Sequence, residues 1–124
     1  MTAAPQAGIS PQIQQQLGMF QQIQQQLQQV SSQKMQYEMT IRETKRALEE
    51  LEAAKDDSVI FSAVGSILIQ KDKAAVKTEL TDKVESLELR VSSLDKQEKA
   101  MTSKAAQLQK QIQDAISSGV PAAQ

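Results

Sequence analysis

Two series of mostly apolar residues that recur every seven positions constrain the fold of this chain more than any other feature. The first series runs through Ile13, Phe20, Leu27, Lys34, Ile41 and Leu48, followed three positions later by Gln16, Ile23, Val30, Tyr37, Thr44 and Leu51. The second runs through Val84, Val91, Glu98, Ala105 and Ile112, accompanied by Leu80, Leu87, Leu94, Met101 and Leu108. These spacings are those of the a and d positions of a coiled coil. The sequence therefore predicts two helices, each with one long buried seam.

Both predicted helices are far longer than the average helix of a globular protein. Ser10 can cap the first helix, and Pro11 suits its first position. Asp72 is a candidate cap for the second helix, and the small residues, glycine and proline of Ser117–Pro121 are typical of a helix end. We expect helices at residues 10–56 and 72–117, each about 65–70 Å long at 1.5 Å per residue, with flexible tails at residues 1–9 and 118–124.

Residues 12–36 are rich in glutamine, which leaves a disordered tract as an alternative to a helix. The seven-residue apolar series continues straight through this segment, and glutamine is a good helix former. We therefore interpret the glutamines as the solvent face of the first helix.

Between the two series lies Ser58–Gln70, which has the composition of a β-hairpin. Val59–Phe61 and Ile67–Ile69 are apolar runs, and Gly65 between them can take the positive φ of a tight loop of three to five residues. Because the apolar residues do not alternate with polar ones, both faces of the hairpin are unsuited to water. A lone hairpin is barely stable in water, and burial of its six large side chains represents on the order of 10 kcal/mol. We expect residues 57–71 to form sheets with other subunits.

Two helices of similar length joined by a hairpin predict a chain that folds back on itself. Counting outward from the hairpin sets Leu48 near Val84. The same count brings Lys34 and Glu98, the charged members of the two series, to one height. They either pair across the seam and fix its register or extend separately to water. The predicted fold is mainly α, a long antiparallel two-helix coiled coil joined by a single β-hairpin.

Composition excludes several classes of function. The 14 basic and 15 acidic residues are intermixed and give a net charge of −1, which argues against a nucleic-acid surface. The absence of cysteine and histidine excludes thiolate chemistry and removes the usual metal ligand and general base. The scattered glycines form no phosphate loop, and the start of the chain lacks the pattern of a signal peptide or membrane span. We expect a cytoplasmic protein that is not an enzyme and uses no cofactor, metal, nucleic acid or membrane.

Some apolar residues near the outer ends of the two helices fall outside the seam. They are Ile9, Leu17, Met19, Ile116 and Val120. Such a cluster at the end opposite the hairpin predicts a surface for apolar partners, and the flexible thioether of Met19 suits varied partners. Fraying of the helix ends with leftover core residues is the alternative. Met35, Met39 and Leu89 are also outside the seam, where they either line a shared cavity or are exposed singly.

The pattern resembles the beta class of the prefoldin family, in particular its archaeal beta subunits. The most specific motif is Val64-Gly65-x-x-Leu68-Ile69 in the hairpin, followed by Glu79-Leu80 near the start of the second helix. The Tyr37…Thr44…Ala47–Leu51 and Leu87–Arg90 stretches are also similar. The resemblance covers roughly residues 10–117. Members of the alpha class have two hairpins between their helices, and this chain has room for one.

The resemblance implies a hexamer of two alpha-class and four beta-class subunits, whose hairpins form a double β-barrel platform. Such assemblies hold unfolded polypeptides without ATP and deliver them to a group II chaperonin. The matching oligomerisation residues are Val59, Ile60, Phe61, Val64, Gly65, Ile67, Leu68 and Ile69. The matching client-binding residues are Ile9, Ile13, Leu17, Met19, Phe20, Leu108, Ile112, Ile116 and Val120. Those that belong to the seam reach a client only if the helices separate. The alternative function is that of a structural or tethering coiled coil with a fixed protein partner.

Overall fold

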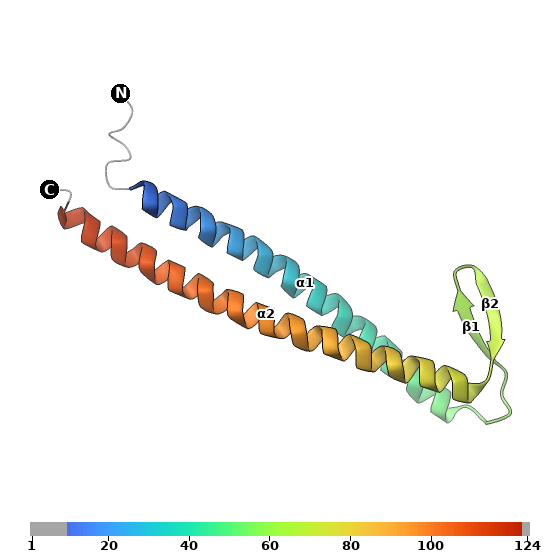
Figure 1. Ribbon diagram of the computed structural model, residues 1–124. Helices are drawn as coiled ribbons and strands as arrows, with labels where there is room; N and C mark the ends of the chain where they lie inside the picture. Colours follow the sequence, from blue (N-terminus) through green and yellow to red (C-terminus); the bar gives the residue numbers. More distant parts are fainter. Residues whose placement is uncertain (1–9, 123–124) are drawn as a thin grey trace. The chain divides into compact units, whose positions relative to one another are not determined.

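The computed structural model describes the backbone of residues 10–122 and the side chains of residues 10–118. The elements are α1 (Pro11–Ala53), β1 (Ile60–Val64), β2 (Ile67–Lys71) and α2 (Lys73–Ala122), in that order (Figure 1). The chain packs as two compact units, one formed by the residues up to Ser32 together with those from Asp95 onward, the other by Gln33–Leu94. We call the first the terminal unit and the second the hairpin unit.

Helix α1 begins at the predicted cap and ends earlier than predicted. The backbone N–H of Ile13 donates to Ser10 Oγ at 3.2 Å, and the N–H of Gln14 donates to the Ser10 carbonyl oxygen at 3.0 Å. The helix stops at Ala53 rather than at residue 56. Beyond it the N–H of Ser58 donates to the Lys55 carbonyl oxygen at 3.0 Å, which closes a turn around the two aspartates. Aspartate favours turns, so the helix ends before this pair instead of including it.

Helix α2 begins directly after Asp72, whose carbonyl oxygen accepts a hydrogen bond from the N–H of Val76 at 3.0 Å. Asp72 thus occupies the predicted cap position. The predicted end at residue 117 is wrong, because α2 continues to Ala122. Proline removes one backbone donor, and a single glycine costs about 1 kcal/mol. At the last turn these penalties affect few hydrogen bonds, so the signals in Ser117–Pro121 do not stop the helix where we expected.

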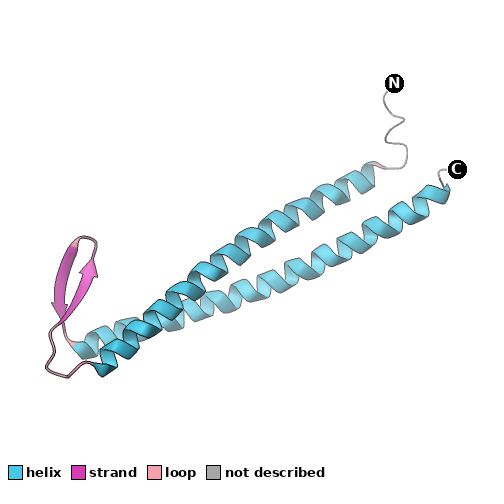
Figure 2. Cartoon of the chain, turned by 180° about the vertical axis from the view of Figure 1, so that it is seen from behind, coloured by secondary structure: helices cyan, strands magenta, loops and turns pink. Residues whose placement is uncertain are grey.

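In each unit a segment of α1 lies beside a segment of α2 and runs in the opposite direction (Figures 1 and 2). Every position of the two predicted seven-residue series is buried or half-buried. The most buried apolar residues are Ile13, Ile23, Leu108 and Ile112 in the terminal unit and Ile41, Leu51 and Val84 in the hairpin unit. The buried hydroxyl of Thr44 donates to the Thr40 carbonyl oxygen at 2.7 Å, which satisfies it within the helix. The predicted coiled-coil fold is therefore confirmed.

Polar contacts between the helices of the hairpin unit follow the same antiparallel order. From the hairpin outward they are Glu52–Lys77 at 2.7 Å, Lys45–Glu88 at 3.3 Å and the Arg90 guanidinium 5.8 Å from the centre of the Tyr37 ring. The side chains of both ion pairs are about half exposed, so they contribute little stability. They mark the register of the two helices.

The hairpin is a two-stranded antiparallel sheet in which Ile60 pairs with Lys71 and Val64 with Ile67. Its loop contains only Gly65 and Ser66, so the predicted loop of three to five residues is wrong. Gly65 has a φ of +63°, and among the described residues no other residue has a positive φ. This combination is that of a type II′ turn. Ser62 and Ala63 continue β1 because the pairing uses backbone groups and does not require large side chains.

Candidate interaction surfaces

The hairpin presents apolar side chains on both of its faces. Cross-strand partners share a face, so the register places Ile60, Val64, Ile67 and Ile69 on one face. The opposite face carries Phe61, Ala63 and Leu68. One face of a sheet can be solvated at little cost only when its side chains are polar. Neither face of this hairpin meets that condition.

Most of these hairpin side chains are exposed in the single chain. The exposed fraction is 57% for Phe61, 63% for Ile67 and 68% for Leu68, and Val59, Val64 and Ile69 are exposed as well. Ile60 is half-buried, and Gly65 lies in the turn. The eight predicted oligomerisation residues thus form one continuous segment with a large exposed apolar surface. Its two strands also have free backbone edges, which can pair with further strands.

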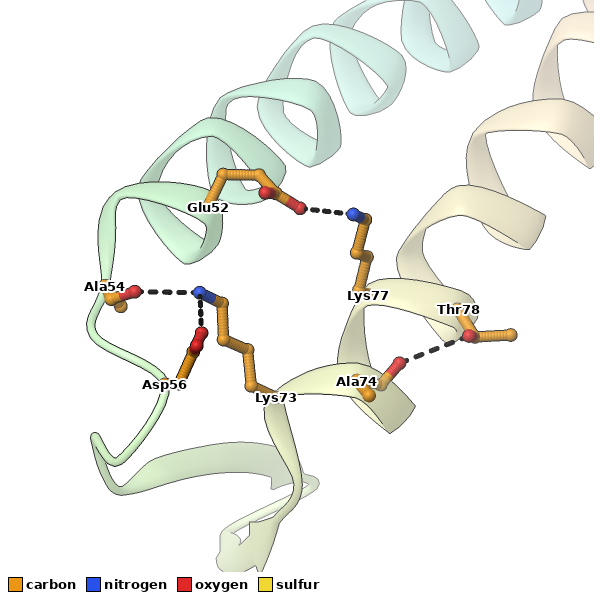
Figure 3. A network of polar contacts seen from close by, with 7 residues as sticks. All are labelled: Glu52, Ala54, Asp56, Lys73, Ala74, Lys77 and Thr78. Atoms are coloured by element: carbon orange, nitrogen blue, oxygen red, sulfur yellow. Dashed lines mark hydrogen bonds and ion pairs between the residues drawn. The ribbon is translucent and has the colours of Figure 1, made fainter.

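A group of lysines fixes the base of the hairpin to both helices (Figure 3). Lys73 Nζ donates to the Ala54 carbonyl oxygen at 2.8 Å and lies 3.2 Å from Asp56 Oδ1. The contact with Ala54 places a positive charge at the C-terminal end of α1, where it is favourable. Lys71, the last residue of β2, pairs with Glu79 Oε1 at 2.9 Å. The chain on either side of the hairpin is therefore tied to the start of α2.

Glu52 is held in its charged form at this base. Lys77 Nζ lies 2.7 Å from Glu52 Oε1. The hydrogen bond from Lys77 and the charge of that ammonium group lower the pKa of Glu52 below its ordinary value. Sequence reasoning did not single out Glu52, Lys73 or Lys77, although the lysines that follow the hairpin are the signal that could have drawn attention to them.

The predicted client-binding residues fall into two groups in the terminal unit. Ile13, Leu108 and Ile112 are buried in the seam. Met19 and Ile116 are exposed, by 38% and 40% respectively, and Leu17 and Phe20 are half-buried. Ile9 and the side chain of Val120 lie outside the described residues. Some of the predicted client-binding side chains are thus exposed at the outer end of the terminal unit, and the rest of the described ones are buried or half-buried.

The apolar residues outside the seam of the hairpin unit are exposed in the single chain. The exposed fraction is 66% for Met35, 55% for Met39 and 73% for Leu89. Exposure in the single chain is compatible with both alternatives, a cavity shared between subunits and isolated surface side chains, so both stay predictions. By their places in the seven-residue series, Met39 and Leu89 each point away from the seam of their own helix, so they do not face one another.

Within residues 10–122, no group of three or more acidic, histidine or cysteine side chains is arranged to hold a metal ion. Neither α1 nor α2, as far as they are described, combines the length and apolar character needed to cross a bilayer.

Comparison with known proteins gives consistent matches over most of the chain. The family described as "Prefoldin subunit" matches residues 14–119. The "Prefoldin subunit beta" of Methanospirillum hungatei is 44% identical over 108 residues, which cover 87% of this chain and 90% of that protein. The protein of the same name from Methanosphaerula palustris is 52% identical over 84 residues, covering 68% of this chain and 69% of that protein. The crystal structure of the prefoldin beta subunit from Thermococcus strain KS-1 superposes with a TM-score of 0.81 at 40% identity, over 87% of this chain and 95% of that one.

Proposed function

The chain belongs to the prefoldin family, in its beta-subunit class, and from this membership we propose that it works as an ATP-independent holding chaperone. Members of the family are chaperone subunits. In the proposal, two alpha-class and four beta-class subunits form a cytoplasmic hexamer on a double β-barrel platform. The terminal units hold unfolded polypeptides, prevent their aggregation and deliver them to a group II chaperonin.

The observation that carries the proposal is the hairpin with two exposed apolar faces. Phe61 and Leu68 on one face and Ile67 and Val64 on the other are each more than half exposed. Burial of a large side chain is worth roughly 1.5–3 kcal/mol, so the hairpin has a strong tendency to pair with others. This tendency supports the proposed platform, which would bring the terminal units of several subunits together around one client.

Each terminal unit contacts a client weakly. Met19 and Ile116 offer partly exposed apolar surface, and Leu17 and Phe20 add to it. Ile13, Leu108 and Ile112 join them when the helices separate. Several weak contacts on one scaffold raise the overall affinity by about 10²–10⁴. Each contact still dissociates quickly, which allows the client to be passed on without a nucleotide-driven step.

The proposal is tested by suppression of aggregation. The full-length chain, mixed with an alpha-class subunit, is added to a guanidinium-denatured enzyme that aggregates on dilution, and light scattering is recorded. One double variant, Met19→Gln with Ile116→Gln, removes the exposed apolar side chains of the terminal unit. A matched variant, Met35→Gln with Met39→Gln, removes two exposed methionines of the hairpin unit instead.

We expect the unmodified complex to suppress scattering, the first variant to lose most of this effect and the second to keep it. Glutamine and methionine have similar helix propensities, so both variants should retain the helices. A structural tether would show no suppression even as the unmodified full-length chain, and that result would reject the chaperone proposal. Equal loss in both variants would reject the assignment of the client site to the terminal unit.

A further inference from the structure

The glutamine-rich part of α1 forms one wall of an open groove in the terminal unit. One hollow of about 620 Å³ is lined by Gln21, Gln24, Gln25, Leu27, Gln28 and Ser31. A second hollow of about 420 Å³ also includes Leu27 and Ser31 and is completed by residues of α2 between Asp95 and Ser103. The two hollows adjoin at Leu27 and Ser31, and we treat them together as one groove. We call it the glutamine groove.

The α1 wall of the glutamine groove is polar and uncharged. Its four glutamines are exposed, and the first charged side chain of the whole sequence is Lys34. A primary amide has two N–H donors and a carbonyl acceptor, which are the groups that a peptide backbone also carries. The wall therefore complements a peptide backbone in hydrogen bonding. The α2 side of the groove carries Asp95, Glu98 and Lys99, and Lys99 Nζ lies 3.2 Å from Asp95 Oδ2, so this cation already has a carboxylate partner.

Two apolar residues, Leu17 and Ile116, lie on the same edge of the terminal unit as the groove. Leu27 is half-buried, and the Ser31 hydroxyl is engaged with Glu98 Oε2 at 2.5 Å. Leu17, Gln24 and Ser31 recur at seven-residue intervals and so share one edge of α1. By the same spacing, Ile116 shares an edge of α2 with Thr102, which lines the groove. The groove and these two apolar residues thus lie along one edge.

We propose that the glutamine groove binds an extended segment of a non-native polypeptide through its backbone. The glutamine amides donate to its peptide carbonyl oxygens and accept from its N–H groups, while Leu17 and Ile116 contact its apolar side chains. This inference rests on the proposed function and adds the chemistry of client recognition. In a folded protein nearly all buried peptide groups are already paired. A surface that reads free peptide groups therefore selects non-native chains whatever their sequence.

The test replaces amides by side chains of similar length and helix propensity. The groove variant is Gln24→Met/Gln25→Met/Gln28→Met. The matched control changes three exposed glutamines of the same segment that do not line the groove, as Gln22→Met/Gln26→Met/Gln29→Met. Methionine removes the donors and the acceptor and adds apolar surface. The groove variant should therefore weaken binding if the client is recognised by amides. It should strengthen binding if the client is recognised by apolar contact. Circular dichroism checks that both variants keep the helix content of the unmodified chain.

The probes are a short fluorescent peptide without stable structure and an analogue of the same sequence in which alternate backbone nitrogens are methylated. Binding is measured by fluorescence anisotropy with the full-length chain mixed with an alpha-class subunit. One net hydrogen bond corresponds to about a fivefold change in affinity. We expect the groove variant to bind the plain peptide about 5- to 25-fold more weakly, and the control to match the unmodified chain. Methylation should weaken binding to the unmodified chain by a similar factor and have little effect on the groove variant.

Three results would overturn the inference. The groove variant could bind the plain peptide as well as the control or more tightly, which would make the contact apolar or place it elsewhere. It could change the sedimentation coefficient while peptide binding is unaltered, which would make the groove an interface between copies of this chain. If the unmodified complex binds neither this peptide nor a denatured protein, the proposed function fails together with the groove. In the first two cases the groove alone fails.

Discussion

Replacement of Phe61 by aspartate should prevent assembly through the hairpin. Phe61 is 57% exposed in the single chain. A phenylalanine offers about 200 Å² for burial, so roughly 110 Å² remains to be covered by a partner, worth about 3 kcal/mol at 25 cal/mol per Å². The carboxylate of Phe61→Asp also resists burial without a partner charge. The association constant at each interface that covers this residue should therefore fall by more than about 100-fold.

The assay is sedimentation velocity of the chain alone and with an alpha-class subunit. Leu89→Asp is the matched control, because Leu89 is 73% exposed on α2 and lies outside the hairpin. We expect Phe61→Asp to sediment as dissociated subunits and Leu89→Asp to sediment like the unmodified assembly. Both variants should retain their helix content by circular dichroism. If Phe61→Asp assembles normally, or if Leu89→Asp dissociates equally, the hairpin is not the assembly surface.

Four further substitutions test the stability of the fold. Gly18→Ala should raise the free energy of unfolding by about 0.5–1 kcal/mol in urea titrations, because Gly18 lies within α1 and an added Cβ meets nothing within 4 Å. Gly65→Ala also has open space but has a φ of +63°, so it should lose roughly 1–2 kcal/mol and weaken assembly; the same sign for both substitutions would refute this reasoning. Gln16→Leu should raise the thermal midpoint, because Gln16 Oε1 is buried with no hydrogen-bond partner in the described structure; a lower midpoint would show that the amide is needed. The lowered pKa of Glu52 means that its pairing with Lys77 stabilises the fold above the ordinary glutamate pKa and is lost as the pH falls through the lowered value. Glu52→Gln should remove this acid-side step from a plot of stability against pH, and an unchanged step would assign it to another carboxyl.

The helical part of the fold could be predicted from the sequence because its signal is local and repeated. In a coiled coil every seven-residue repeat indicates which residues face the partner helix, so a long series gives the same prediction many times. Ile13 and Ile112 near one end and Leu51 and Val84 near the other are all buried as the series requires. The pairing of Lys34 with Glu98 stays a prediction, and the structure adds a hydroxyl contact to Glu98 from Ser31.

The boundaries were predicted less well because they depend on a few residues at each junction. Ser62 and Ala63 look like loop residues, yet backbone pairing carries β1 through them to Val64. Helix α2 similarly continues through the segment that begins at Ser117. Backbone pairing with β2 in the first case, and backbone hydrogen bonding to the preceding helical turn in the second, outweighs the preference of the local side chains.

The contacts that join distant residues could not be predicted from spacing alone. Lys73 Nζ donates to the carbonyl oxygen of Ala54, although the whole hairpin separates the two residues in the sequence. This contact depends on how α1 ends and α2 begins. The glutamine groove has the same origin. The bias of residues 12–36 is visible in the sequence, but the structure is needed to show that Gln24 and Gln28 line the groove while Gln26 is not among its lining residues.

The distribution of charge differs between the base of the hairpin, which carries ion pairs, and the α1 wall of the glutamine groove, which carries no charge. Charged side chains begin at Lys34, and two ion pairs of the hairpin unit, Lys77–Glu52 and Lys73–Asp56, lie beside the hairpin. These pairs add little stability in water, but they link the start of α2 to the end of α1 and to the turn that precedes β1. The α1 wall of the glutamine groove is uncharged, and the hydrogen bonds that we propose it makes to a client would replace bonds to water at a small net gain each. Such a surface binds through the number of its contacts rather than the strength of any one. This suits the proposed ATP-independent holding chaperone, because such a protein has no nucleotide-driven step to break a strong contact.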